Sequence, residues 1–275
     1  MERIRGHAPL AWVSRASGLR FSSLGSGSEG NGLVVEVGQT RLLLDCGFSA
    51  RETQARLARI GLAPDQLDAI LVTHEHDDHI GGVFGFARRH GIRVCLSHGT
   101  LEAQRASDPA AEAGVDITLL HADEKYSVGA VEILPFTVPH DAREPLHYVF
   151  SDGARRLGVL TDTGCSTPHI EKTLSGLDAL VLETNHDLDM LCNSDYPQSL
   201  KARIAGHLGH LDNHAAGALL AALDRSRLKH VIAAHLSRKN NLPALARAAL
   251  AAVLGCEAED VAIADQGKGF DWREI

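Results

Sequence analysis

The segment Thr73–His79, which reads Thr-His-Glu-His-Asp-Asp-His, constrains the fold and chemistry of this chain more than any other feature. It holds four side chains of metal-ligand type, namely His74, His76, Asp78 and His79. The apolar run before it predicts a strand over 68–73, and side chains two apart on an extended segment point the same way. His74 and His76 can therefore bind one ion together. Imidazole and carboxylate suit Zn²⁺, and also Mn²⁺ or Fe²⁺. The alternative is a solvated polar loop, which the strict spacing disfavours.

Further residues of ligand type follow other apolar runs, where loops at one sheet edge can converge. They are Asp45 after 42–44, His140 after 136–139, Asp162 after 157–161 and His235 after 231–234. Each one alone has a simpler explanation, since an aspartate after a strand often serves a turn or helix cap. A single histidine is likewise more often a satisfied polar group. Their shared context predicts one site together with the histidine cluster.

Composition bounds the classes of function. The 275 residues are 44% hydrophobic and 23% charged, which is ordinary for a soluble globular protein. The net charge of −8 argues against a surface coated in basic residues for nucleic-acid binding, although a local basic groove stays open. No run of about 18 apolar residues predicts a membrane span.

Five scattered cysteines without a CxxC pair predict reduced thiols and a cytoplasmic protein. Cys46 and Cys165 stand close to candidate ligands, and the sequence leaves a redox role for them open. It also leaves the oligomeric state open.

The order of apolar runs predicts an α/β protein. Strand hairpins are expected at 33–37 with 41–45 and at 148–150 with 157–161, and helices at 50–61, 79–90, 197–206, 213–224 and 243–254. Further strands are expected at 93–97, within 116–138, and at 178–183, 230–234 and 261–265, with a helix from 97 to about 106. Hairpins in each half with helices between them favour a four-layer αββα sandwich. Residues 1–20 read as a loose leader and 21–275 as one domain.

The cluster His74–His79 matches the HxHxDH motif, and the chain resembles the metallo-β-lactamase fold hydrolases from about Phe21 to its end. Within that superfamily it is most similar to the YycJ/WalJ (VicX) group. The similarity is carried by the segments 25–31, 138–142, 160–164, 183–187, 209–213 and 234–237. That group is related to ribonuclease Z and the cyclic phosphodiesterases, and its members are described as 5′-exonucleases or as generic hydrolases.

The resemblance implies two divalent metal ions, zinc in the first place with manganese as the alternative. The first ion would be held by His74, His76 and His140, and the second by Asp78, His79 and His235. Asp162 would bridge the two ions, and Asp45 would orient their ligands from behind. Such a pair can share a hydroxide that serves as the nucleophile. The resemblance implies that Asp78 is a catalytic residue as well as a metal ligand.

Several residues are candidates for contact with substrate. His210 resembles the histidine that donates a proton or binds phosphate in the phosphodiesterase relatives. A surface histidine that caps helix 213–224 explains it equally well. Ser28 and Asn31, in a loop of small residues, could approach a phosphate, although a plain turn is the commoner meaning of such a loop. His186 is a weaker candidate for the same contact. Arg238, in the best local basic feature of an acidic chain, could meet a phosphate backbone near the metals.

Three functions are weighed on this basis. The first is a metal-dependent phosphodiesterase, namely a 5′-exonuclease acting on nucleic acid through a metal-bridging hydroxide. The second is a small-molecule hydrolase of the same fold, acting on a thioester, lactone or cyclic phosphate, which the acidic net charge favours. The third, a binding protein with structural metal, fits poorly because structural zinc sites are usually closed by four protein ligands.

Overall fold

Two mixed β-sheets form the centre of the molecule. The computed structural model describes residues 18–275, and within them each sheet has seven strands. The first sheet has the order β14 (Phe270–Glu274), β1 (Arg20–Gly25), β2 (Gly32–Val37), β3 (Thr40–Leu44), β4 (Ala69–Leu71), β5 (Arg93–Leu96) and β6 (Ile117–Leu119). The second has the order β13 (Ala262–Ile263), β12 (His230–Ala234), β11 (Ala179–Glu183), β10 (Arg156–Leu160), β9 (Leu146–Ser151), β8 (Val131–Thr137) and β7 (Tyr126–Val128).

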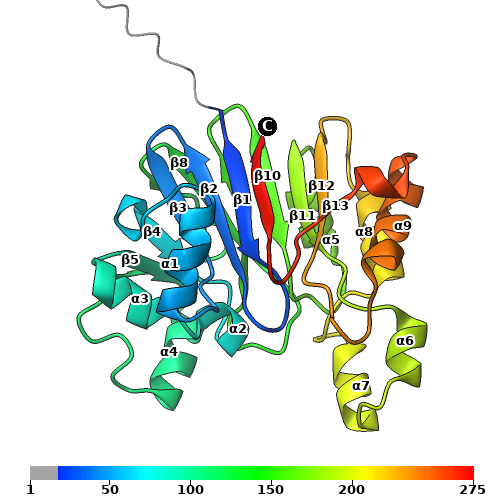
Figure 1. The fold of residues 1–275 in the computed structure, drawn as a ribbon, viewed down its shortest axis with the longest axis horizontal. Coiled ribbons are helices and arrows are strands. Elements are labelled where there is room, and N and C mark those ends of the chain that lie inside the picture. The colour runs from blue at the N-terminus through cyan, green and yellow to red at the C-terminus, as the bar shows by residue number, and fades with distance from the viewer. Residues whose placement is uncertain (1–17) are drawn as a thin grey trace, which may run out of the picture.

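Helices cover the outer face of each sheet (Figure 1). Beside the first sheet lie α1 (Ala50–Arg59), α2 (Asp77–Ile80), α3 (Val83–His90) and α4 (His98–Ser107), with a 3₁₀ turn at Pro64–Gln66. With the second sheet belong α5 (Pro168–Leu174), α6 (Leu188–Asn193), α7 (Gln198–Ile204), α8 (Asn213–Ala222) and α9 (Pro243–Leu254), with a 3₁₀ turn at Ala258–Asp260. Within the described residues, none of these helices is both long and apolar enough to cross a membrane.

Three apolar clusters hold these layers together. One lies between the sheets and includes Phe21, Leu42, Tyr148 and Ile232. A second joins the first sheet to its helices, and a third joins the second sheet to α5, α8 and α9. Because each sheet buries both faces, one against the other sheet and one against helices, the predicted αββα sandwich is confirmed.

Most predicted elements are present, with one split and several additions. The expected helix over 79–90 is wrong as a single helix, because the chain forms α2 and α3 with a break at Gly81 and Gly82. At the break, a Cβ on Gly82 would lie 2.0 Å from the carbonyl oxygen of Phe48. Strands β1 and β14 and helices α5 and α6 were not predicted. Residues 1–17 of the expected leader lie outside the described residues, and β1 begins at Arg20.

Parallel strands place several polar residues at one edge of the sandwich. Strands β3, β4 and β5 are parallel in the first sheet, and β10, β11 and β12 are parallel in the second. The carboxyl ends of parallel strands face the same edge, which is where open α/β sheets bind their ligands. Asp45 and His235 directly follow β3 and β12, and Asp162 comes two residues after the end of β10, so all three lie at this edge.

The two glycines that flank the start of α3 differ in their surroundings, and this difference is testable. Gly82→Ala should destabilise the protein by about 1–3 kcal/mol, because its Cβ would collide with the backbone of Phe48 and Cys46. Gly85→Ala, with no atom within 4 Å of its Cβ, should stabilise the protein by about 0.5–1 kcal/mol. Denaturant unfolding measures both free energies, and equal effects of the two changes would contradict this packing.

Candidate metal centre

Three residues at the sheet edge have an unusual backbone conformation. Asp45, Asp162 and His235 have φ values of 60°, 47° and 55°, in the left-handed region. Among the described residues only one other non-glycine residue, Asp123, has a positive φ. Such residues cost about 1–3 kcal/mol each and persist where the surroundings fix them, often at functional sites. The strain is therefore concentrated where the candidate ligands gather.

Three histidine nitrogens converge at one point of this edge. His76 Nδ1 lies 3.0 Å from His74 Nε2 and 3.3 Å from His140 Nε2. Nitrogen ligands of one tetrahedral zinc ion stand about 3.3 Å apart, because the zinc–nitrogen bond is about 2.0–2.1 Å. The ring of His140 is oriented by its Nδ1, which lies 3.1 Å from the Gly209 carbonyl oxygen. The three nitrogens therefore fit the first ligand set expected from the sequence.

A second group lies beside the first. Asp78 Oδ2 lies 3.5 Å from His79 Nε2 and 3.4 Å from His235 Nε2. Behind it, Asp45 Oδ2 lies 2.8 Å from His79 Nδ1 and also accepts a hydrogen bond from the Thr73 hydroxyl. A carboxylate on the far nitrogen of a histidine orients the ring toward a metal, which is the position expected for Asp45.

Asp162 lies between the two groups. Its Oδ2 is 3.1 Å from His79 Nε2, and its Oδ1 is 3.3 Å from His235 Nδ1. The residue is 2% exposed, and Oδ2 accepts no hydrogen bond among the described residues. Buried carboxylate oxygens normally accept hydrogen bonds, so an oxygen that lies 3.1 Å from a histidine nitrogen without accepting one fits a site where both atoms bind a cation.

Glu183 was not among the predicted site residues, although the structure places it in this cluster. It ends β11, is fully buried, and accepts hydrogen bonds from the backbone N–H groups of Thr163 and Leu211. Its Oε1 lies 2.7 Å from His210 Nδ1 and 3.2 Å from His235 Nδ1. Its sequence context, an acidic residue at the end of an apolar strand, is the same as that of Asp162 and could have identified it.

Charges in the cluster shift the proton affinities of these groups. Burial alone would raise the pKa of Glu183, but the neighbouring His210 and His235 lower it to about 2. Burial would lower the pKa of His210, but the carboxylates of Glu183 and Asp162 raise it above its ordinary value. Glu183 is therefore an ionised partner that favours a protonated His210.

The remaining candidates differ in how close they lie to the cluster. Asn31 Nδ2 lies 3.0 Å from His79 Nε2, so Asn31 is part of the cluster. The side chain of Ser28 is exposed. His186 is 1% exposed, and within the described residues neither ring nitrogen has a hydrogen-bond partner. Arg238 is an exposed ion-pair partner of Glu29.

The alternative role of His210 as a helix cap is wrong. The cap of α8 is Asp212, whose carboxylate accepts the backbone N–H groups of His214 and Ala215. Asp212 therefore has a structural role beside the site. Partly exposed side chains of His76, Asp78, His210 and Asp141 mark the open side of the cluster.

Comparison with known proteins adds family information to this geometry. Residues 40–235 match the model of the "Beta-lactamase superfamily domain". The chain is 37% identical to exodeoxyribonuclease YycJ of Bacillus anthracis, over 86% of this chain and 89% of that protein. It is 34% identical to exodeoxyribonuclease WalJ of Streptococcus pneumoniae, over 93% of each chain. The metallo-β-lactamase fold protein YhfI of Bacillus subtilis superimposes with a TM-score of 0.72 at 17% identity, over 94% of this chain and all of that one.

Removal of one ligand tests the metal site directly. His76→Ala should lower the bound zinc or manganese by at least one ion per chain and reduce the rise in melting temperature that the metal causes, because only the folded chain binds it. His121→Ala, at an exposed histidine far along the chain, is the matched control. Elemental analysis and thermal unfolding measure both effects. Full metal retention by His76→Ala would refute the assignment.

Proposed function

Because the chain belongs to the β-lactamase superfamily and to its YycJ/WalJ group, we propose that it is a metal-dependent exodeoxyribonuclease. The observation that carries this proposal is the buried Oδ2 of Asp162, which lies among histidine nitrogens without accepting a hydrogen bond, in a chain that matches two exodeoxyribonucleases over most of its length. The proposed substrate is a DNA strand hydrolysed from its 5′ end.

Two ions are proposed at the cluster. His74, His76 and His140 would hold one, and Asp78, His79 and His235 would hold the other, with Asp162 between them. The imidazole ligands suit zinc, and the carboxylates leave manganese as the alternative. When bound, such a pair supplies an ionised water as nucleophile and offsets the negative charge of the phosphate oxygens.

His210 is proposed as the acid of the reaction. Its Nδ1 is engaged by Glu183, so Nε2 is the nitrogen left for the substrate. Water attacks phosphorus, the bond from phosphorus to the leaving sugar oxygen breaks, and the proton of His210 Nε2 passes to that oxygen. Glu183 stabilises the charged imidazole before the transfer, since a carboxylate within hydrogen-bond distance favours the protonated ring.

Small-molecule hydrolysis is the second candidate. The net charge of −8 favours it, because an acidic protein repels a polyanion over long range. A screen of metal-loaded protein on DNA, a thioester, a lactone and a cyclic phosphate separates the two candidates. Faster turnover of any small substrate than of DNA would replace the nuclease proposal.

The proposed activity has a direct assay. Metal-loaded protein should shorten a 5′-phosphorylated single-stranded oligonucleotide from its 5′ end, and His210→Ala should retain its metal but lose about 10²–10⁴-fold in turnover, the usual contribution of a general acid. Gel analysis of end-labelled DNA measures the products. Unchanged turnover in His210→Ala would remove the proposed acid, and absence of cleavage by the wild type would remove the nuclease.

The pH profile tests the partnership of Glu183 and His210. His210 must be protonated to act, so on the alkaline side of the profile kcat should fall as the pH rises through the raised pKa of His210. Glu183→Gln removes the charge that raises this pKa, so the fall should move to lower pH. Because Glu183 also contacts the proposed metal ligand His235, the metal content of Glu183→Gln is measured as a control. A profile that does not move would contradict the partnership.

A further inference from the structure

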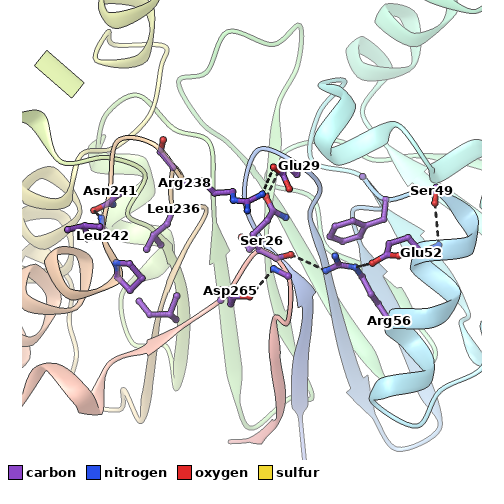
Figure 2. Close-up of a pocket in the computed structure, with 18 residues that line it drawn as sticks. Ser26, Glu29, Ser49, Glu52, Arg56, Leu236, Arg238, Asn241, Leu242 and Asp265 are labelled. Atoms are coloured by element: carbon purple, nitrogen blue, oxygen red, sulfur yellow. Dashed lines mark hydrogen bonds and ion pairs between the residues drawn. The ribbon is translucent and has the colours of Figure 1, made fainter. Parts of the chain in front are cut away.

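A cavity of about 720 Å³ lies beside the metal-ligand cluster, between the two halves of the molecule (Figure 2). The loop after β1 lines one side, the start of α1 a second, and the segment after β12 a third. The wall touches the cluster, since the Ser26 hydroxyl oxygen accepts the backbone N–H of His235 at 3.0 Å. Leu236 and Ser237, which directly follow His235, also line the cavity.

We propose that this cavity binds the terminal nucleotide of the DNA strand, with its 5′-phosphate at Arg238 and its base against the leucine side. This inference rests on the proposed nuclease function and adds the site that holds the end of the substrate. Cavities of about 300–1,000 Å³ are the usual size for ligands of this class.

One side of the cavity is apolar. Leu236, Leu242, Pro243 and Ile263 contribute to it. Leu242 is 52% exposed, so its side chain is available for contact with a ligand. The flat face of a nucleobase would cover this surface, and contact between bases and apolar or aromatic side chains depends little on base identity.

The cation available to a phosphate is Arg238. Its partner is Glu29, and the side chains are 62% and 61% exposed. An ion pair so exposed is worth about 0–1 kcal/mol, so a phosphate can replace Glu29 at small cost. Phosphate also matches the planar guanidinium, which can donate two parallel hydrogen bonds to it.

Arg56, the other arginine of the cavity, has a structural role. It donates hydrogen bonds to the carboxylate of Glu52 and to the carbonyl oxygens of Leu24 and Gln266. Its guanidinium also lies 3.9 Å from the ring centre of Phe48. With these contacts made, Arg56 fixes the wall of the cavity and leaves phosphate binding to Arg238.

Charge orients the nucleotide within the cavity. Arg238 and Glu29 lie on one side of Ser26, and Asp265 lies on the other (Figure 2). The Asp265 carboxylate accepts the backbone N–H groups of Gly267 and Lys268, so it is held in place. It repels a phosphate from its own side and so directs that group to Arg238. The Ser26 hydroxyl can donate its proton to the same phosphate, since it only accepts from His235.

Nucleotide binding to the metal-loaded protein tests the site. Deoxyadenosine 5′-monophosphate should bind the wild type more tightly than deoxyadenosine or inorganic phosphate does. Arg238→Gln should weaken its binding by about tenfold, the loss of one charge-assisted pair. Leu242→Ser should weaken it by about threefold through the lost apolar contact. Calorimetric titration measures the dissociation constants of all three ligands.

Matched variants control for general effects of charge and surface. Lys239→Gln removes the neighbouring cation, which pairs with Asp195 outside the cavity, and Leu245→Ser changes a leucine one turn away on α9. Both should bind the nucleotide as the wild type does. Glu29→Gln should strengthen binding by about threefold, because it frees Arg238 from its partner.

The outcomes separate this site from the function it rests on. A phosphate held by metal ions alone would be insensitive to Leu242→Ser, so equal affinity in the wild type, Arg238→Gln and Leu242→Ser would overturn the nucleotide site. If the wild type still shortens DNA in that case, the proposed nuclease stands without it. If the wild type does not cleave DNA, the nuclease proposal fails whatever the nucleotide affinities are.

Discussion

The buried charge of Asp162 is the constraint on which the centre of this molecule depends. Taking an ionised carboxylate out of water costs several kcal/mol, which nearby positive charge must offset. Burial by itself would raise the pKa of Asp162, but His235 and His79 hold it well below its usual range. His79 lies in α2 beside the first sheet, whereas Asp162 and His235 follow strands of the second, so the offset requires that the two sheets keep a fixed relative position. The apolar cluster between the sheets fixes that position.

The sequence predicts the parts of the site that are local or that follow strands. The histidine cluster is contiguous, and Asp45, Asp162 and His235 each end an apolar run, so their placement at one edge follows from parallel strands. Glu183 shares that context, yet its role depends on contacts with His210 and His235 that are 27 and 52 residues away. Contacts at such separation leave no periodic signal in the sequence.

The same physical reason explains the differences in the fold. Strand β1 pairs with β14 at the other end of the chain, as Arg20 opposite Glu274 shows. It carries Ser22 and Ser23 between Phe21 and Leu24, so it lacks the apolar run that marks β2 and β3. The break between α2 and α3 comes from the carbonyl of Phe48, which approaches Gly82 from a distant loop. By contrast, α9 was predicted at its observed bounds because Pro243 begins it and Gly255, with a φ of 67°, ends it.

An acidic net charge is compatible with a DNA substrate when basic groups near the site are held by weak pairs. Arg238 pairs with Glu29, and Arg203 pairs with Asp141 at the open side of the cluster. Each pair neutralises an arginine while the substrate is away, and each is exposed enough that a phosphate can compete for the cation. Sequence-independent binding of DNA depends on such phosphate contacts rather than on the charge of the whole protein. The acidic surface then weakens the attraction of DNA over long distances. The arginines bind phosphate groups once the DNA strand has reached the edge of the sheets.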